Sequence, residues 1–283
     1  MNYRYVAGII ALLLLPDLSI LYAQGISVDA GLTPPRGRLI IRMMTKNMKK
    51  SGTMPGSGME MSTYVNSAVL VYGVRPDLTV MARQSFVNRK TLSNASTIKT
   101  NGLSDLFINM KYKALRRNTE SFTLGIAPYL GINIPTGKEM FTSNTLDLFS
   151  GLFLSYRRGA WGSDFNMSYK FMGITGNEED EPEKGNEISL DMALGYQFSL
   201  DKSDHFTLSP VVEFNYIHIF QNELQNLRLD NSGEKVLFIS PGLKFTTSNF
   251  IIETIFQPPV FQKQNGIQPE RKTGFIFGIR FLL

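Results

Sequence analysis

The chain has 283 residues, no cysteine, and a net charge of +5 from 29 Lys and Arg against 24 Asp and Glu. The lack of cysteine excludes disulfides, thiolate metal sites, cysteine nucleophiles and lipoprotein acylation at cysteine. The mild, dispersed positive charge does not indicate binding to nucleic acid. A hydrophobic content of 43% is too low for a helical membrane protein, but it suits a transmembrane barrel, whose inward residues are polar.

The N-terminus is typical of a secretory signal peptide over residues 1–23. Arg4 supplies the positive start, and the apolar run from Val6 to Leu15 is too short to span a bilayer as a helix. Cleavage after Ala23 is expected, and an uncleaved membrane anchor is the alternative. Residues 24–38 then form a lead-in that either tucks into a lumen or lies in the periplasm, and residues 39–283 form a single barrel domain.

From about Leu39 onward, apolar and polar residues alternate with a period of two, which indicates strands with two unlike faces. The clearest case is Trp161–Met172, where aromatic residues share one face and Asp164 and Lys170 share the other. We predict about 12 strands, near Leu39–Lys46, Thr63–Val74, Leu78–Val87, Leu103–Leu115, Phe122–Ile134, Asp147–Arg157, Trp161–Met172, Ile188–Ser199, Phe206–Phe220, Val236–Thr246, Phe250–Phe256 and Thr273–Leu283.

Three features favour a membrane barrel over a soluble sandwich. Many segments run about 10 residues, the length of a tilted membrane-spanning strand, whereas sandwich strands usually have about 5 or 6. Short turns alternate with long connections, as in outer-membrane barrels. The last strand ends in Phe281-Leu282-Leu283 and resembles the signal for the barrel-assembly machinery, although the usual final residue is Phe. The long connections are Asn47–Ser62, Asn88–Gly102, Pro135–Leu146, Gly173–Glu187, Glu223–Lys235 and Gln257–Lys272.

The predicted fold class is therefore all-β: a transmembrane antiparallel up-and-down β-barrel, integral to the outer membrane of a Gram-negative cell and surrounded by outer-membrane lipid. Charges facing lipid near mid-membrane would cost about 2–4 kcal/mol each. Parity accordingly places one set of ionisable residues in the lumen: Arg42, Lys46, Arg83, Asp105, Lys111, Lys113, Arg157, Asp164, Lys170, Asp191, Glu213, Lys244, Glu253 and Arg280. Two interpretations stay open, namely a polar passage that prefers anions and a web of ion pairs that fills the lumen.

The first long connection and its flanks are rich in methionine: Met43, Met44, Met48, Met54, Met59 and Met61. Thioethers can bind Cu(I), but no His or Cys lies nearby, so we expect flexible apolar filler and no cofactor. Neither His205 nor His218 has a serine at the offset that outer-membrane phospholipases use. Near His218 and Glu223, the constellation of outer-membrane proteases is incomplete. We therefore expect no enzyme activity.

Three short motifs carry a family resemblance. They are Gly31-Leu32-Thr33-Pro34-Pro35-Arg36-Gly37, Gly102-Leu103-Ser104-Asp105-Leu106 and Ile134-Pro135-Thr136-Gly137. Together they resemble the outer-membrane transporters of the phenol-degradation MetA-pathway family, which commonly has Gly where this chain has Ser104. The resemblance implies an outer-membrane barrel and transport of small hydrophobic or aromatic compounds. For Asp105, we expect a structural pairing with a lumen cation such as Lys111 or Arg83.

The leading functional hypothesis is a passive channel or transporter for small molecules across the outer membrane. A rival is a closed structural or surface barrel that acts through its external loops. A third is a metal-related barrel that uses the methionine-rich connection. Conductance of the purified barrel separates the first hypothesis from the second, and ordering of the first connection by copper tests the third.

Overall fold

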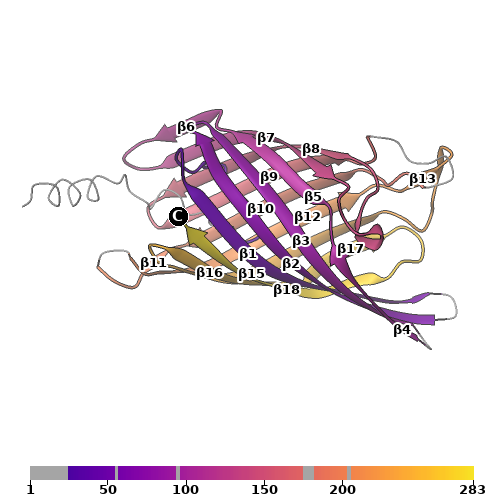
Figure 1. Ribbon diagram of the computed structural model, residues 1–283. Helices are drawn as coiled ribbons and strands as arrows, with labels where there is room; N and C mark the ends of the chain where they lie inside the picture. Colours follow the sequence, from indigo (N-terminus) through magenta and orange to yellow (C-terminus); the bar gives the residue numbers. More distant parts are fainter. Residues whose placement is uncertain (1–24, 55–56, 94–95, 175–181, 203–204) are drawn as a thin grey trace, which may run out of the picture.

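One antiparallel sheet closes on itself to form the barrel of this computed structural model (Figure 1). The structure describes residues 25–54, 57–93, 96–174, 182–202 and 205–283, so the predicted signal peptide lies outside the described residues. Within those ranges, no helix has the length and apolar character needed to cross a membrane. Each strand pairs with its neighbours in sequence, and the first strand pairs with the last. The predicted up-and-down barrel is confirmed.

Twelve strands form the ring. Their bounds are β1 (Leu39–Met54), β2 (Ser57–Arg75), β3 (Leu78–Ser93), β5 (Leu106–Tyr112), β7 (Thr123–Ile134), β8 (Asp147–Arg158), β9 (Trp161–Phe171), β10 (Glu187–Tyr196), β12 (Thr207–Ile219), β15 (Glu234–Thr246), β16 (Phe250–Gln257) and β18 (Glu270–Leu282). Four short strands continue them: β4 (Ser96–Leu103), β6 (Leu115–Asn118), β11 (Phe198–Ser199) and β17 (Pro259–Gln264). A separate hairpin joins β13 (Glu223–Leu224) to β14 (Leu227–Arg228), and η2 is a 3-10 turn at Glu139–Phe141.

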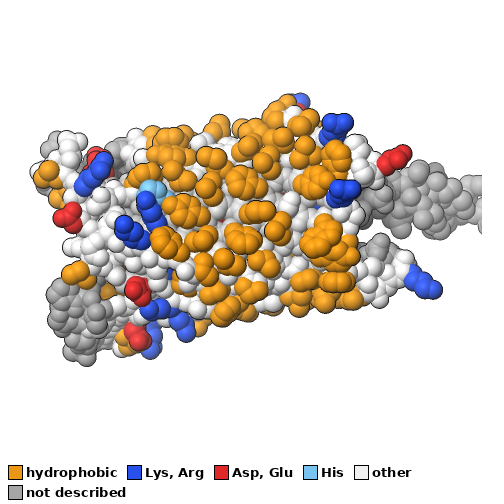
Figure 2. Space-filling model, turned by 180° about the vertical axis from the view of Figure 1, so that it is seen from behind, with side chains coloured by type: hydrophobic (Ala, Val, Ile, Leu, Met, Phe, Trp, Pro, Cys, Tyr) orange, Lys and Arg blue, Asp and Glu red, His pale blue; other side chains and the backbone are white. Residues whose placement is uncertain are grey.

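The two faces of the sheet differ as lipid on one side and a lumen on the other require. Apolar side chains such as Leu130, Met167 and Phe277 are exposed on the outer face. On the side of the barrel that Figure 2 shows, apolar side chains form a broad belt across its middle. Charged side chains such as Glu213 and Lys244 are buried on the inner face. Basic and acidic side chains lie beyond the ends of the belt (Figure 2).

Two predicted loops are mostly strand. Residues 47–62 continue β1 and β2 as a ladder up to the pair Met54 and Ser57, and residues 88–102 continue β3 and β4 in the same way. The hydrophobic period fails there because polar residues occupy both faces, although the backbone still pairs. Both hairpins project beyond the barrel at the end opposite the C-terminus (Figure 1).

Two further boundaries differ from the prediction. The strand expected at Leu103–Leu115 is broken at residues 104–105 and 113–114, so β4, β5 and β6 together occupy one strand position of the ring, between β3 and β7. The connection expected at Gln257–Lys272 contains β17, which pairs with the outer end of β15. Backbone pairing with a neighbouring strand sets these bounds, and a single sequence does not show it.

A charge on the lipid face tests which side of the sheet meets the membrane. Leu130 faces outward near the middle of β7. We expect Leu130→Arg to lower the free energy of unfolding by about 2–4 kcal/mol, measured by denaturant titration in phospholipid vesicles with Trp161, the single tryptophan, as the reporter. Ser121→Arg, in the exposed turn before β7, is the matched control, and equal losses in the two variants would contradict the assignment.

Candidate functional site

The middle of the lumen holds one carboxylate between two guanidinium groups, called the arginine–glutamate group below. Glu253 of β16 forms salt bridges with Arg42 of β1 at 2.8 Å and with Arg280 of β18 at 2.7 Å. Arg42 lies directly opposite Arg280 in the β1–β18 ladder, where two cations alone would repel each other. The shared carboxylate offsets that repulsion. Gly278 provides the space, since a Cβ there would lie 3.0 Å from a Glu253 oxygen.

A second set of ion pairs stiffens β8 and β9. Arg157 donates to both carboxylate oxygens of Asp164, at 2.8 and 2.9 Å, and the Ser155 hydroxyl donates to Asp164 as well. Nearer the long loops, Lys170 pairs with Asp147 at 3.0 Å. Both carboxylates are fully buried, and removing one partner of such a pair is strongly destabilising.

Residues 25–34, called the lumen segment below, lie inside the barrel. Of the two places that the sequence left open for the lead-in, the structure therefore shows the lumen. Ile26 and Val28 are completely buried. They pack in one apolar cluster with side chains that face inward from β10, β12, β16, β18 and β1, namely Ala193, Val211, Ile255, Ile276 and Met44.

Charged side chains of the wall hold the backbone at the start of the lumen segment. Glu213 of β12 accepts hydrogen bonds from the amides of Ile26 and Ser27, and from the Ser27 hydroxyl. Arg42 and Arg280 both donate to the carbonyl of Ile26. In each arginine, the same guanidinium nitrogen that pairs with Glu253 therefore also binds the lumen segment.

The later part of the lumen segment is held from β5 and β8. Lys111 donates to the carbonyls of Ala30 at 2.7 Å and Leu32 at 3.1 Å. The amide of Gly31 donates to the Ser155 hydroxyl at 2.8 Å. Buried backbone groups nearly always need such partners, so the wall of the lumen and the lumen segment are chemically matched.

Two glycines let the lumen segment pass close to the wall. A Cβ on Gly31 would lie 2.8 Å from the carbonyl oxygen of Phe153, and one on Gly125 would lie 2.7 Å from the Leu32 side chain. Contacts under 3.0 Å force something to shift. The first of the three sequence motifs therefore begins with a glycine because its backbone touches β7 and β8.

A small cavity, called the inner cavity below, lies between the lumen segment and β1, β2, β3 and β5. It has a volume of about 140 Å³, and Asp29 faces it together with Arg42, Arg83 and Lys111. Arg83 lies 4.8 Å from the Phe107 ring and makes no salt bridge within the described ranges. Apolar side chains complete the lining: Ile40, Met44, Val69, Val71 and Met81.

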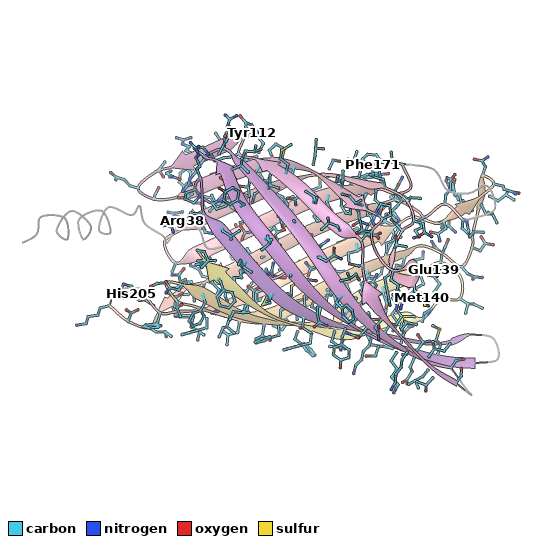
Figure 3. All side chains as sticks on the ribbon, viewed as in Figure 1. Arg38, Tyr112, Glu139, Met140, Phe171 and His205 are labelled. Atoms are coloured by element: carbon cyan, nitrogen blue, oxygen red, sulfur yellow. The ribbon has the colours of Figure 1, made fainter. Side chains whose placement is uncertain are left out.

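A larger open cavity, called the outer vestibule below, lies further along β1, toward the long loops. It has a volume of about 540 Å³ and is lined by Lys46, Met48, Lys50, Met61, Arg89, Phe238 and Arg271, among others. Glu234 holds Arg271 at 2.6 Å and Lys50 at 3.3 Å. In Figure 3, Tyr112 and Arg38 lie at the C-terminal end of the barrel, while Glu139 and Met140 lie toward the vestibule end.

The remaining candidates from the sequence take several positions. Asp191 accepts a hydrogen bond from Asn215 at 3.0 Å, and Lys244 is fully buried in the wall. Lys113 donates to the carbonyl of Pro76 at 2.5 Å, so it fixes a turn at the end of the barrel. Of the predicted set, the structure thus gathers only some members around the lumen segment.

Asp105 does not pair with Lys111 or Arg83 as expected. It accepts hydrogen bonds from the amide of Gly137 at 3.0 Å and the amide of Ser143 at 2.8 Å. Asp105 lies in the break between β4 and β5, on the side of the long loops, whereas Lys111 is near the opposite end of β5. Its role is to tie the β7–β8 loop to the wall.

The second and third sequence motifs meet at this point. Besides the contact between Asp105 and Gly137, the amide of Leu106 donates to the Thr136 hydroxyl at 3.1 Å. Gly137 is close enough that a Cβ would lie 2.9 Å from the amide nitrogen of Asp105. The two motifs, distant in sequence, therefore form one structural joint.

The methionines do not gather at one point. Met43 faces outward and is exposed, while Met44 faces the lumen segment, because successive residues of a strand point to opposite faces. Met48 and Met61 line the outer vestibule. The side chain of Met54 lies outside the described residues. Met43 and Met44 therefore cannot share one metal ion.

The two histidines lie near opposite ends of β12. His205 precedes the strand, with Nδ1 3.8 Å from an Asp201 carboxylate oxygen, and His218 packs against Phe220 with the ring centroids 4.4 Å apart. Thirteen positions of extended chain separate them by about 40 Å. Among the described residues, no group of three or more His, Cys, Asp or Glu is arranged to hold a metal ion.

Reasoning from the sequence missed the apolar contacts of the lumen segment. Val211 and Ile276 occupy inward positions that polar residues hold elsewhere, and they contact Ile26 and Val28. A signal was present: Ile26, Val28, Ala30 and Leu32 alternate in the lead-in. Apolar residues at inward positions of the wall indicate that something apolar covers them.

Comparisons with known proteins agree with this fold. A model of the family described as "Putative MetA-pathway of phenol degradation" matches residues 54–254. An outer membrane channel from Pseudomonas putida F1 is similar, with a TM-score of 0.68 and 14% identity over 93% of this chain and 100% of that one. The beta domain of the Bordetella autotransporter BrkA has a TM-score of 0.50 and 10% identity over 87% and 99%. No curated protein matches the sequence.

A disulfide tests the position of the lumen segment, because the chain has no cysteine of its own. The Ser27 hydroxyl lies 3.4 Å from the Asn215 amide nitrogen. We expect the pair Ser27→Cys and Asn215→Cys to cross-link under mild oxidation, seen by mass spectrometry. Ser27→Cys with Asn133→Cys is the control, since Asn133 contacts Asp105 and Asp147 instead. Equal cross-linking in both pairs would show that the segment is not fixed there.

Proposed function

The chain belongs to this phenol-degradation MetA-pathway family, and from that premise we propose that it is a passive channel of the Gram-negative outer membrane for small molecules. In this proposal the lumen segment is an internal gate. Export by the signal peptide and insertion by the barrel-assembly machinery, through the C-terminal strand, belong to the same proposal. Passage requires no chemical step.

The observation that carries the proposal is that the lumen segment lies beside the inner cavity, while the outer vestibule opens further along β1, toward the long loops. The backbone of the lumen segment bonds mainly to side chains of the barrel wall. The lumen segment contributes no strand to the sheet, so it can shift without breaking the ladder that closes the barrel. A gate of this kind keeps the barrel intact whether the route is open or closed.

The linings indicate the kind of molecule that passes. The inner cavity combines apolar side chains such as Val69 and Met81 with the guanidinium of Arg83. A cavity of about 150 Å³ holds one benzene ring, close to the volume observed here. The outer vestibule likewise combines Phe238 with basic residues such as Arg89. We propose a cargo with a single aromatic ring and an anionic group.

One observation favours a second candidate function, a closed structural barrel that acts through its external loops. The lumen segment and the ion pairs around Glu253 and Asp164 fill the middle of the lumen. If these contacts never open, the barrel conducts nothing and only its outer surface acts.

Single-channel conductance in a planar bilayer separates the two functions. We expect deletion of residues 25–34 to raise the conductance several-fold over that of the intact protein, because it removes chain that packs inside the lumen. The reversal potential under a salt gradient should show anion preference, since basic side chains predominate in both linings. The doubly substituted Glu223→Gln, Arg228→Gln protein, altered in the exposed β13–β14 hairpin, is the control. An electrically silent deletion variant that is folded would reject a channel.

A substitution in the inner cavity tests the proposed cargo. We expect Arg83→Gln to slow uptake of benzoate into liposomes about tenfold while leaving uptake of benzyl alcohol unchanged, because only the anion loses a partner. Lys113→Gln, at the turn near Pro76, is the matched loss of one charge. Equal slowing of both compounds would mean that Arg83 shapes the wall and does not select charge.

A further inference from the structure

The β1–β2 and β3–β4 hairpins are much longer than a membrane requires. β2 has 19 residues, and β1 and β3 have 16 each, while a tilted spanning strand needs about 9–11. The excess projects on the side of the long loops (Figure 1). These hairpins therefore carry the sheet through the headgroup layer of the outer leaflet.

One lateral line of the sheet, called the lysine row below, crosses this region on five strands. Lys49 of β1 lies opposite Lys272 of β18 on one side and Ser62 of β2 on the other. Ser62 lies opposite Lys90 of β3, which lies opposite Lys99 of β4. The lysine row thus consists of four exposed lysines around one serine.

Three of the four lysines in the lysine row lack a salt-bridge partner among the described residues. Lys272 pairs with Glu270 at 2.8 Å, but Lys49, Lys90 and Lys99 form no salt bridge among the residues that the structure describes. Like charges directly opposite each other destabilise a sheet. An external anion that bridges the lysines would relieve this repulsion.

Apolar and aromatic side chains adjoin the lysine row on the membrane side. Asn47 lies two residues before Lys49 in β1, on the same face of the sheet. Phe275 and Tyr64 flank it on the neighbouring strands, and both are exposed. Phe86 and Leu103, which are also exposed, face each other four residues from Lys90 and Lys99. Aromatic residues mark the membrane–water interface, so the lysines stand where lipid phosphates lie. The row also lines a surface groove of about 700 Å³ with Tyr64.

We infer that the lysine row is a binding site for a lipid whose headgroup carries two phosphates. The phosphates would bridge the facing lysines, and the acyl chains would lie against the aromatic side chains below. This inference rests on the outer-membrane location in the proposed function, but it does not depend on an open lumen. Lipid binding by a barrel that conducts no current therefore supports this inference as well as lipid binding by a conducting barrel does.

The test is native mass spectrometry of the full chain in detergent with bisphosphorylated lipid A, compared with monophosphoryl lipid A. We expect the triple variant Lys49→Gln, Lys90→Gln, Lys99→Gln to bind the bisphosphorylated lipid about a hundredfold more weakly than the unsubstituted protein. The control Arg116→Gln, Arg117→Gln, Arg158→Gln removes the same charge at the opposite end of the barrel and should retain the affinity.

Stability without lipid separates a ligand site from a structural role. In detergent alone, the lysine variant should unfold at the same temperature as the unsubstituted protein or at a higher one, because repulsion is removed. Unfolding at a lower temperature would contradict the inference, as would equal binding by the two triple variants or equal binding of the two lipids. Inorganic pyrophosphate that binds as tightly as the lipid would overturn the assignment to a lipid.

Discussion

Buried backbone groups of the lumen segment need hydrogen-bond partners, and the rest of the lumen is arranged to provide them. Glu213 accepts hydrogen bonds from the amides of Ile26 and Ser27, while Arg42 and Arg280 donate to the carbonyl of Ile26. The arginines face each other only because Glu253 lies between them. The ion pairs that fill the lumen thus also hold the lumen segment, which in the proposed function opens the barrel without breaking its ladder.

The sequence predicts the barrel well, because lipid imposes a period of two on every spanning strand. It predicts the hairpins at residues 47–62 and 88–102 poorly, because they lie beyond the hydrocarbon core and polar residues occupy both of their faces. The partner of Asp105 was beyond reach because it depends on where β4 breaks from β5. The alternation of apolar residues that includes Ile26 and Val28 indicated that the lumen segment has a buried face. The wall residues that cover these two side chains come from five strands, which only the closed ring brings together.

Basic side chains lie next to apolar ones on both sides of the barrel wall. On the inside, the vestibule and the inner cavity combine cations with apolar side chains, a pairing suited to ring-bearing anions. On the outside, the lysine row lies next to the aromatic border, a pairing suited to phosphorylated lipid. In both places basic charge that exceeds the local carboxylates is left for a ligand.

The current through a locked gate tests the central claim most directly. The protein with Ser27→Cys and Asn215→Cys would be inserted oxidised into a planar bilayer, and a reductant would then be added to the same membrane. We predict no current before reduction and repeated openings afterwards, because only the freed lumen segment can leave the lumen. Steady conductance that is the same before and after reduction would contradict the claim that this segment is the gate.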